Sequence, residues 1–208
     1  MPDLRLRYFD FRGGRGEAAR LALAIGGVAF EEDRIPVADW PKHQAGTRFR
    51  ALPILEIDGE PLTQSNAINR YVGRLAGLYP EDALEAARCD EVMDAVEDIV
   101  TQTVATFGLS GDALKEARGA LVTGPLELYL ARLEAMLVAR GGAFFADGRL
   151  TVADLKVYVW VENLRSGVLD HVPRDLVDRV APKLVAQRDQ IASLPGVVAY
   201  YERLRASS

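Results

Sequence analysis

The stretch ALPILEIDGEPLTQSNAINRY, residues 51–71, decides the fold of this chain. Ile54–Ile57 is a short apolar run typical of a strand, and the Asp58-Gly59 pair that follows is a strong signal for a hairpin turn. Pro61-Leu62 begins the returning strand, and Ser65–Leu75 has the apolar spacing of a helix. We therefore expect a strand, a tight turn, a second strand and a helix.

Pro53 is unusual in this pattern, because proline has no backbone N–H to donate to a sheet. A cis peptide bond before Pro53 would turn the backbone of Leu52 outward, where it can pair with an extended peptide. An ordinary edge-strand proline is the alternative. Ser65 begins the helix, so it is either an N-cap or, with Gln64, part of a carboxylate site at the helix N-terminus.

The preceding residues predict the rest of a small sheet. Leu4–Phe9 is typical of a strand, residues 13–16 contain three glycines, and Glu17–Ile25 is apolar at helical spacing. Val28–Val37 predicts a second strand, whereas residues 39–50 are polar and irregular. The order βαβ followed by ββα indicates a mixed sheet of four strands.

From Tyr79 onward the pattern changes to helices alone. They are expected at about 83–107, 112–140, 152–166, 174–192 and 195–205. We therefore divide the chain into an α/β domain, residues 1–78, and an all-helical domain, residues 83–208. Thr151 and Asp154 have the spacing of a capping box, with a binding role for Asp154 as the alternative.

Charge and composition exclude several classes of protein. The 208 residues carry a net charge of −5, yet residues 1–78 hold eleven Lys/Arg against ten Asp/Glu. This balance suits a small anionic ligand, and no basic run is long enough to bind nucleic acid. No apolar run approaches the ~18 residues of a membrane span, and the N-terminus lacks the apolar run of a signal peptide. We expect a cytoplasmic protein.

The residue types that bind metals or form disulfides are scarce. Cys89 is the only cysteine, so an intrachain disulfide is excluded, and we interpret it as a buried structural residue. His43 and His171 have no partner at the spacing of a metal site or a catalytic triad. We therefore expect no metal.

Six segments in order resemble cytosolic glutathione transferases, and most closely their Tyr-type, sigma-like members. The segments are RYFDFRGGRGEAARLAL, ADWPK, LPILEIDGEPLTQSNAINRY, GLYPEDALEAARCDEV, LTVADL and LPGVVAYYERL. The resemblance implies a thioredoxin-like domain followed by an all-helical domain, usually in a homodimer. It also implies glutathione as co-substrate and a role in detoxification.

The resemblance assigns the chemistry to two residues. Tyr8 matches the catalytic tyrosine, whose hydroxyl stabilises the thiolate of glutathione more than its thiol. Arg15 matches an arginine near the thiol, where its positive charge favours the thiolate. The alternatives are a tyrosine in the core and a solvated arginine at a helix start.

Glutathione itself would be bound by residues from several segments. The backbone of Leu52, before a cis Pro53, would pair with the cysteinyl residue, while Gln64 and Ser65 would hold the γ-glutamyl carboxylate. The Trp40 indole would donate to the glycine carboxylate.

Three assignments stay open. Either Lys42 or Gln44 would assist Trp40 at the glycine carboxylate. Asp98 matches an acid that crosses to the γ-glutamyl amine in the neighbouring subunit, and a surface carboxylate is the alternative. Phe49 would insert into the partner subunit or be buried within its own.

A small hydrophobic electrophile is expected to bind between the two domains. Its candidate contacts are Phe11, Arg12, Gly14, Val104, Phe107, Lys156 and Trp160. The predicted activity is conjugation of glutathione to such an electrophile. A glutathione-dependent isomerase or peroxidase, and a non-catalytic binding protein, are the alternatives.

Overall fold

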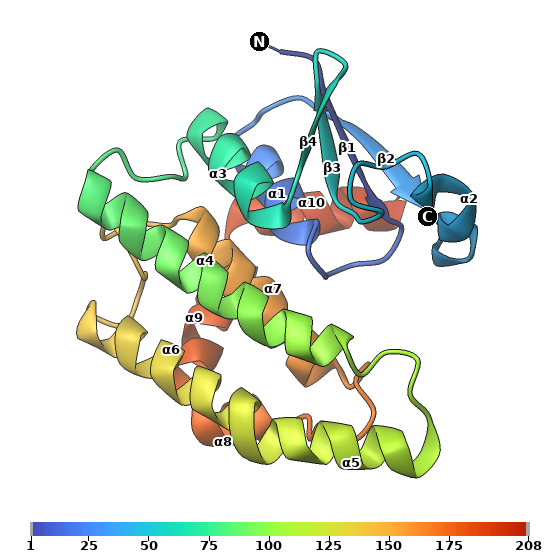
Figure 1. Cartoon of the computed structure of the whole chain (residues 1–208). Helices are drawn as coiled ribbons and strands as arrows, with labels where there is room; N and C mark the ends of the chain where they lie inside the picture. Colours follow the sequence, from blue (N-terminus) through green and yellow to red (C-terminus); the bar gives the residue numbers. More distant parts are fainter. Residues whose placement is uncertain (1, 207–208) are drawn as a thin grey trace. The chain divides into compact units, whose positions relative to one another are not determined.

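The computed structural model describes residues 2–206, and the chain forms two compact units (Figure 1). The first unit contains residues 2–79 and 195–206, and the second contains residues 80–194. The predicted division assigned residues 195–208 to the helical domain, whereas the last helix, α10 (Pro195–Ala206), packs against α1 (Glu17–Ile25) and groups with the first unit. Gly196 permits this close packing, because a Cβ there would lie 3.0 Å from Cγ1 of Ile25.

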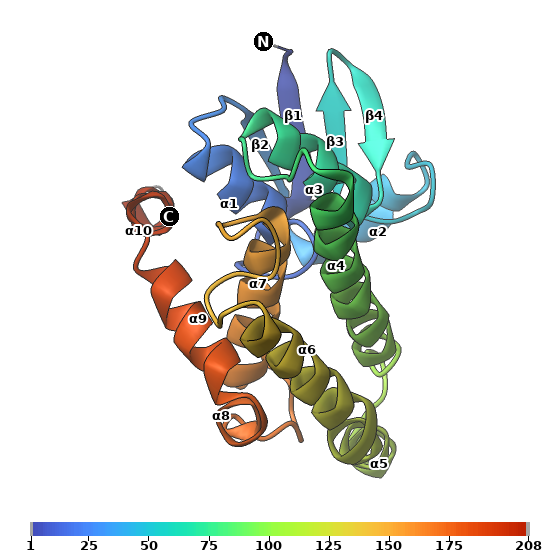
Figure 2. The same ribbon diagram turned by 90° about the vertical axis from the view of Figure 1, so that its left-hand side faces the viewer.

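The first unit contains the predicted four-stranded mixed sheet. Its strands are β1 (Leu4–Phe9), β2 (Glu31–Ile35), β3 (Ile54–Ile57) and β4 (Glu60–Thr63), in the order β2-β1-β3-β4. β1 pairs with β2 in parallel, and the other two pairs are antiparallel. Helices α1 and α3 (Ser65–Leu75) lie side by side on one face of the sheet (Figures 1 and 2).

The Asp58-Gly59 turn joins β3 to β4 as predicted. Ile57 pairs with Glu60, so the turn has two central residues. Asp58 has φ +51° and Gly59 has φ +85°. Positive φ at both positions is the geometry of a type I′ turn, whose twist matches that of the flanking strands.

Two expectations for the first unit were wrong. The strand predicted over residues 28–37 is limited to β2, and Pro36, which cannot donate to a ladder, directly follows it. The segment predicted to be irregular forms a short turn of 3-10 helix, Val37–Asp39, and helix α2, Trp40–Gln44. Pro41 suits this helix because the first turn needs no N–H donor within the helix.

Glycine allows the chain between β1 and α1 to pass close to Tyr8. A Cβ at Gly16 would lie 2.4 Å from Cγ of Tyr8, and one at Gly14 would lie 2.4 Å from its hydroxyl oxygen. Gly14 also has φ +70°, whereas Gly16 has an ordinary φ of −89°. Substitution at Gly16 therefore tests the space around the Tyr8 ring without adding backbone strain.

The second unit is all-helical, as predicted (Figure 2). Its helices are α4 (Ala83–Val104), α5 (Gly111–Leu121), α6 (Glu127–Ala139), α7 (Val152–Ser166), α8 (Leu176–Val180) and α9 (Pro182–Ala192). A π-helical turn, Val122–Leu126, joins α5 to α6 within the helix predicted over residues 112–140. The helix predicted over 174–192 is interrupted before Pro182, which lacks an N–H to continue it. No helix within residues 2–206 is long and apolar enough to cross a membrane.

The predicted capping box at the start of α7 is confirmed. The fully buried Asp154 carboxylate accepts hydrogen bonds from the N–H of Thr151, 2.8 Å, and from its hydroxyl, 2.7 Å. It also accepts from the N–H of Phe145, 3.0 Å, and from Nε2 of Gln187, 2.8 Å. Burial raises the pKa of Asp154 to about 6, although the hydrogen bonds from Thr151 and Phe145 favour its charged form. One carboxylate thus connects α7, α9 and the loop before α7.

We predict that Asp154→Ala lowers the free energy of unfolding by about 2–4 kcal/mol, because it leaves buried donors without an acceptor. Urea unfolding monitored by circular dichroism measures the change. The matched control is Asp175→Ala, which removes an exposed carboxylate paired with Arg179 at 3.3 Å and is expected to cost less than about 0.5 kcal/mol. Equal costs for the two variants would contradict the prediction.

We also predict that Gly16→Ala destabilises the chain by about 1–3 kcal/mol, because the new methyl group overlaps the base of the Tyr8 ring. The control is Gly119→Ala in α5, where a Cβ would meet nothing within 4 Å. That variant is expected to be neutral or to stabilise by up to about 1 kcal/mol. The comparison of the two unfolding midpoints is the measurement, and a Gly16→Ala protein as stable as its parent would show that the ring can move aside.

Candidate functional site

Three stretches that are far apart in the sequence meet at one end of the sheet. Arg7 of β1 pairs with Ile54 of β3, and Ile54 pairs with Thr63 of β4, so these residues form one row across three strands. The next residues beyond this row are Tyr8, Pro53 and Gln64. Strand register therefore brings together the catalytic, backbone-pairing and helix-start candidates of the sequence analysis.

Tyr8 lies near the end of β1, and only 4% of its surface is exposed. Its hydroxyl oxygen accepts a hydrogen bond of 2.8 Å from the backbone N–H of Arg15. Burial raises the pKa of Tyr8 above its ordinary value, and the bond from Arg15 partly opposes this rise. At neutral pH the hydroxyl is therefore protonated, and its own hydrogen remains available to donate to an anion.

An aromatic and aliphatic cluster surrounds Tyr8. Tyr8, Leu52 and Ile54 belong to one buried group, and Phe9 and Trp40 pack against it. The rings of Phe9 and Trp40 meet edge to face, with centroids 5.8 Å apart. Three predicted site residues from separate segments, Tyr8, Trp40 and Leu52, are thus in one cluster.

The peptide bond between Leu52 and Pro53 is cis, as predicted. Both residues are buried, and the paired register of β3 begins after them, at Ile54. The backbone N–H and C=O of Leu52 therefore lie outside the ladder of β3.

Gln64, rather than Ser65, occupies the N-cap position of α3, and its side chain makes no capping hydrogen bond. The interpretation of Ser65 as a simple N-cap is therefore wrong: Ser65 is the first helical residue and is buried. Gln64 is exposed and has φ +73°, a backbone region that residues other than glycine seldom adopt. Strained backbone of this kind is concentrated at binding sites.

Helix α2 carries the three candidates for the glycine carboxylate of glutathione. Trp40 is its first residue, the ammonium of Lys42 pairs with Asp39 at 2.5 Å, and Nε2 of Gln44 donates to the carbonyl of Arg50 at 3.4 Å. The Lys42 pair is exposed, so it is weak and easily exchanged for another anion.

The loop between β1 and α1 presents Phe11, Arg12 and Arg15. Phe11 is 40% exposed and stacks on Phe9, with centroids 5.6 Å apart. The guanidinium of Arg12 lies over the ring of Tyr201 in α10, 3.9 Å from its centroid. The ring of Phe11 lies edge to face with that of Tyr8, with centroids 5.8 Å apart, whereas the guanidinium of Arg12 is directed to α10.

The candidates in the helical unit differ in exposure. Asp98 is exposed, and the hydroxyl of Tyr129 donates to it at 3.5 Å. Val104 and Phe107 are exposed at the C-terminal end of α4 and just beyond it. Lys156 and Trp160 of α7 are buried instead, and Lys156 forms an ion pair of 2.6 Å with Glu97.

Two other residues singled out in the sequence, Cys89 and Phe49, differ in burial. Cys89 is buried as predicted, and burial raises the pKa of its thiol to about 11, so it is a poor nucleophile. Phe49 is 59% exposed within this chain. Within residues 2–206, no group of three His, Cys, Asp or Glu side chains is placed to hold a metal ion.

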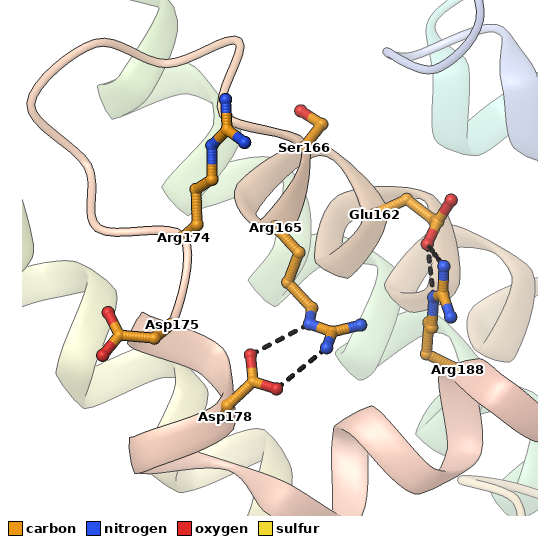
Figure 3. Close-up of a pocket in the computed structure, with 7 residues that line it drawn as sticks. All are labelled: Glu162, Arg165, Ser166, Arg174, Asp175, Asp178 and Arg188. Carbon is orange, nitrogen blue, oxygen red and sulfur yellow. Dashed lines mark hydrogen bonds and ion pairs between the residues drawn. The ribbon is translucent and has the colours of Figure 1, made fainter.

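A charged cavity of about 470 Å³ lies within the helical unit (Figure 3). It is lined by Glu162, Arg165, Ser166, Arg174, Asp175, Asp178 and Arg188. Arg165 forms two hydrogen bonds with Asp178, at 2.9 and 2.8 Å, and Arg188 pairs with Glu162. Because most of its charges are matched internally, this cavity is a poor candidate for a charged ligand.

A buried ion pair beside the site, Arg20 with Glu17, was not predicted from the sequence. Arg20 lies on the otherwise apolar helix α1 and is fully buried with Glu17. The signal was present, since Glu17 and Arg20 are three residues apart and share one helix face.

Comparison with known proteins identifies the family. The model of the glutathione S-transferase N-terminal domain matches residues 4–74, and that of the C-terminal domain matches residues 97–203. Glutathione S-transferase 1 of Ascaris suum is 37% identical over 162 residues, which are 76% of this chain and 78% of that protein. Hematopoietic prostaglandin D synthase of Gallus gallus is 32% identical over 203 residues, 98% of this chain and 97% of that one.

A solved structure supports the same conclusion. That of prostaglandin synthase D of Nilaparvata lugens matches with a TM-score of 0.86 and 29% identity, covering 97% of this chain and 98% of the other. The predicted thioredoxin-like domain followed by a helical domain is confirmed, although α10, inside the C-terminal family domain, packs with the first unit. The chain belongs to the glutathione S-transferase family.

Proposed function

We propose that the Tyr8 hydroxyl stabilises the thiolate of glutathione for attack on a small hydrophobic electrophile, as in Tyr-type, sigma-like transferases. The observation that carries the proposal is the hydrogen bond from the Arg15 N–H to the Tyr8 oxygen. This bond fixes the hydroxyl and leaves its hydrogen to donate to sulfur. The sulfur then forms a bond to the electrophilic carbon as the leaving group departs, and the thiol proton goes to solvent.

The size of this effect is sufficient for catalysis. A free cysteine thiol has a pKa of about 8.5, so most of it is protonated at neutral pH. One hydrogen bond to the thiolate contributes on the order of 1.5–3 kcal/mol, which lowers the thiol pKa by about one to two units. The guanidinium of Arg15 would add to this stabilisation, and proximity would supply the remainder.

The donors at this end of the sheet are suited to an extended tripeptide with two carboxylates. The start of α3, with Gln64 and Ser65, would hold the γ-glutamyl carboxylate on its N-terminal amides. The Leu52 backbone, beside Pro53, would pair with the cysteinyl residue, and Trp40 would hold the glycine carboxylate. Because Lys42 has an exposed and exchangeable partner, we favour it over Gln44 as the cation at that carboxylate.

The remaining proposals concern the residues that contact the electrophile and the partner subunit. Phe11, Arg12 and Gly14 would contact the electrophile from the first unit. In the helical unit the exposed Val104 and Phe107 are better candidates than the buried Lys156 and Trp160. We also propose a cytoplasmic homodimer in which Asp98 reaches the glutathione of the neighbouring subunit.

A second candidate function is isomerisation of an endoperoxide. It is favoured by the similarity to hematopoietic prostaglandin D synthase of Gallus gallus, which extends over 97% of that protein. The same thiolate at Tyr8 would serve this reaction, and glutathione would be regenerated. Glutathione-dependent reduction of an organic hydroperoxide and binding without catalysis are further candidates for the same residues.

We predict that Tyr8→Phe lowers the turnover of conjugation by more than tenfold, because it removes the hydroxyl that donates to sulfur and accepts from the Arg15 N–H. The affinity for glutathione should stay within about threefold, because the proposed contacts to its backbone and carboxylates remain. Steady-state assay with 1-chloro-2,4-dinitrobenzene and calorimetric titration with glutathione measure the two effects. Tyr71→Phe in α3 is the control and should behave as the parent protein. Unchanged turnover in Tyr8→Phe would remove Tyr8 from its role.

Assays with an aromatic halide, an endoperoxide and a hydroperoxide, together with the glutathione titration, separate the candidate functions. Conjugation with the aromatic halide supports a transferase, and faster conversion of an endoperoxide supports an isomerase. Glutathione binding with no turnover of halide, endoperoxide or hydroperoxide would favour a non-catalytic binding protein. Failure to bind glutathione would overturn the transferase, isomerase and peroxidase functions.

A further inference from the structure

Arg20 makes direct hydrogen bonds to the segment that carries the catalytic tyrosine. Its side chain is 0% exposed, and its two terminal nitrogens donate to backbone carbonyls of this segment. Nη2 donates to the carbonyl of Phe9 at 2.8 Å, and Nη1 donates to that of Phe11 at 3.2 Å. The planar guanidinium thus holds two carbonyls, one directly after Tyr8 and one in the following loop.

The charge of Arg20 is balanced by two carboxylates on different elements. Glu17 of α1 lies 3.1 Å from Nη1, and Glu32 of β2 lies 3.4 Å from Nε. A buried guanidinium needs such partners, because an unpaired buried charge is costly. Lysine could not replace it, because an ammonium lacks the planar fork that reaches two acceptors and two carboxylates.

Glu32 is itself held from the far side. Nη2 of Arg34 lies 2.5 Å from the Glu32 carboxylate and donates to the Tyr200 hydroxyl of α10 at 2.9 Å. The chain of contacts therefore runs from α10 through Arg34 and Glu32 to Arg20, entirely within the first unit. This support leaves Arg20 little freedom to move.

The hydrogen bonds to these two carbonyls matter because they anchor a loop whose glycines can adopt many backbone conformations. Gly13 and Gly14 adopt φ +98° and +70°, conformations that glycine enters and leaves easily. The same loop ends at Arg15, whose N–H orients the Tyr8 hydroxyl. Arg20 also lies 5.4 Å from the centre of the Tyr8 ring. A shift of the loop would therefore change the direction of the hydroxyl.

Building on the proposed function, we propose that Arg20, anchored by Glu17 and Glu32, is a positioning residue for thiolate formation. It holds the carbonyls of Phe9 and Phe11. Through the loop it keeps the Arg15 N–H within hydrogen-bonding distance of the Tyr8 hydroxyl. It does not touch glutathione. Its contribution is the geometry of the fork rather than its positive charge alone.

The test measures ionisation of bound glutathione directly. The ultraviolet difference absorbance of the thiolate is followed against pH in the complex with glutathione, for the parent, Arg20→Lys and Arg20→Gln. Both variants should raise the pH midpoint, so that the thiolate fraction well below the midpoint falls about threefold to tenfold. Arg74→Gln, which removes an exposed arginine of α3, is the control and should keep the parent midpoint.

The outcomes discriminate between positioning, charge and stability. A parent midpoint in Arg20→Lys would overturn the proposal, because charge alone would then suffice. Lower melting temperatures with unchanged midpoints in both variants would also overturn it, since Arg20 would then serve stability only. If neither variant folds, Glu32→Gln removes one anchor at a half-buried position, and an unchanged midpoint there would overturn the proposal.

Failure of the proposed function has a different signature. A parent protein that binds no glutathione, or that shows no thiolate absorbance at any pH, would remove the premise in the parent itself. A parent that ionises glutathione, together with variants that match it, would overturn only the role of Arg20.

Discussion

The hydrogen bond from the Arg15 N–H to the Tyr8 hydroxyl is the contact on which the candidate site depends. It joins the end of β1 to the start of α1, and it determines where the hydroxyl hydrogen can point. Two glycines leave room for the ring, and Arg20 fixes the intervening loop. These contacts leave the Tyr8 side chain in a buried, largely apolar environment. In such an environment a hydrogen bond to an anion is stronger than in water.

The start of α3 supplies a different kind of interaction at the same end of the sheet. Its N-terminal amides and dipole favour an anion, and the positive φ of Gln64 directs the chain into the helix without a capping side chain. The strain at Gln64 is retained because the β3–β4 hairpin and α3 hold the chain on both sides of it. A ligand carboxylate at this position would add an acceptor at a helix start where the Gln64 side chain makes no capping hydrogen bond.

The helical unit is stabilised by its own buried network around Asp154, which depends on none of the residues at Tyr8. Its four hydrogen bonds tie α7 to α9 and to the preceding loop. The candidates for electrophile binding in this unit are therefore carried by a scaffold whose stability is separate from the chemistry.

Much of the fold was determined by the sequence itself, because the signals are local. The Asp58-Gly59 turn, the helix Ser65–Leu75 and the capping box at Thr151 each depend on residues within a few positions of one another. The short helix at Trp40 was missed because its polar residues have no apolar periodicity, and the break before Pro182 was missed within a longer helical pattern. The site residues were named mainly through the resemblance to a family, since no local rule separates Tyr8 from a core aromatic.

Tertiary structure decided which of these residues meet. Strand register places Tyr8, Pro53 and Gln64 at one end of the sheet, and packing brings Trp40 to the cluster around Tyr8. The fork of Arg20 and the grouping of α10 with the first unit depend on contacts between residues far apart in the chain. Such contacts form only when whole elements pack together, so a sequence pattern that reports neighbours within a few positions cannot reveal them.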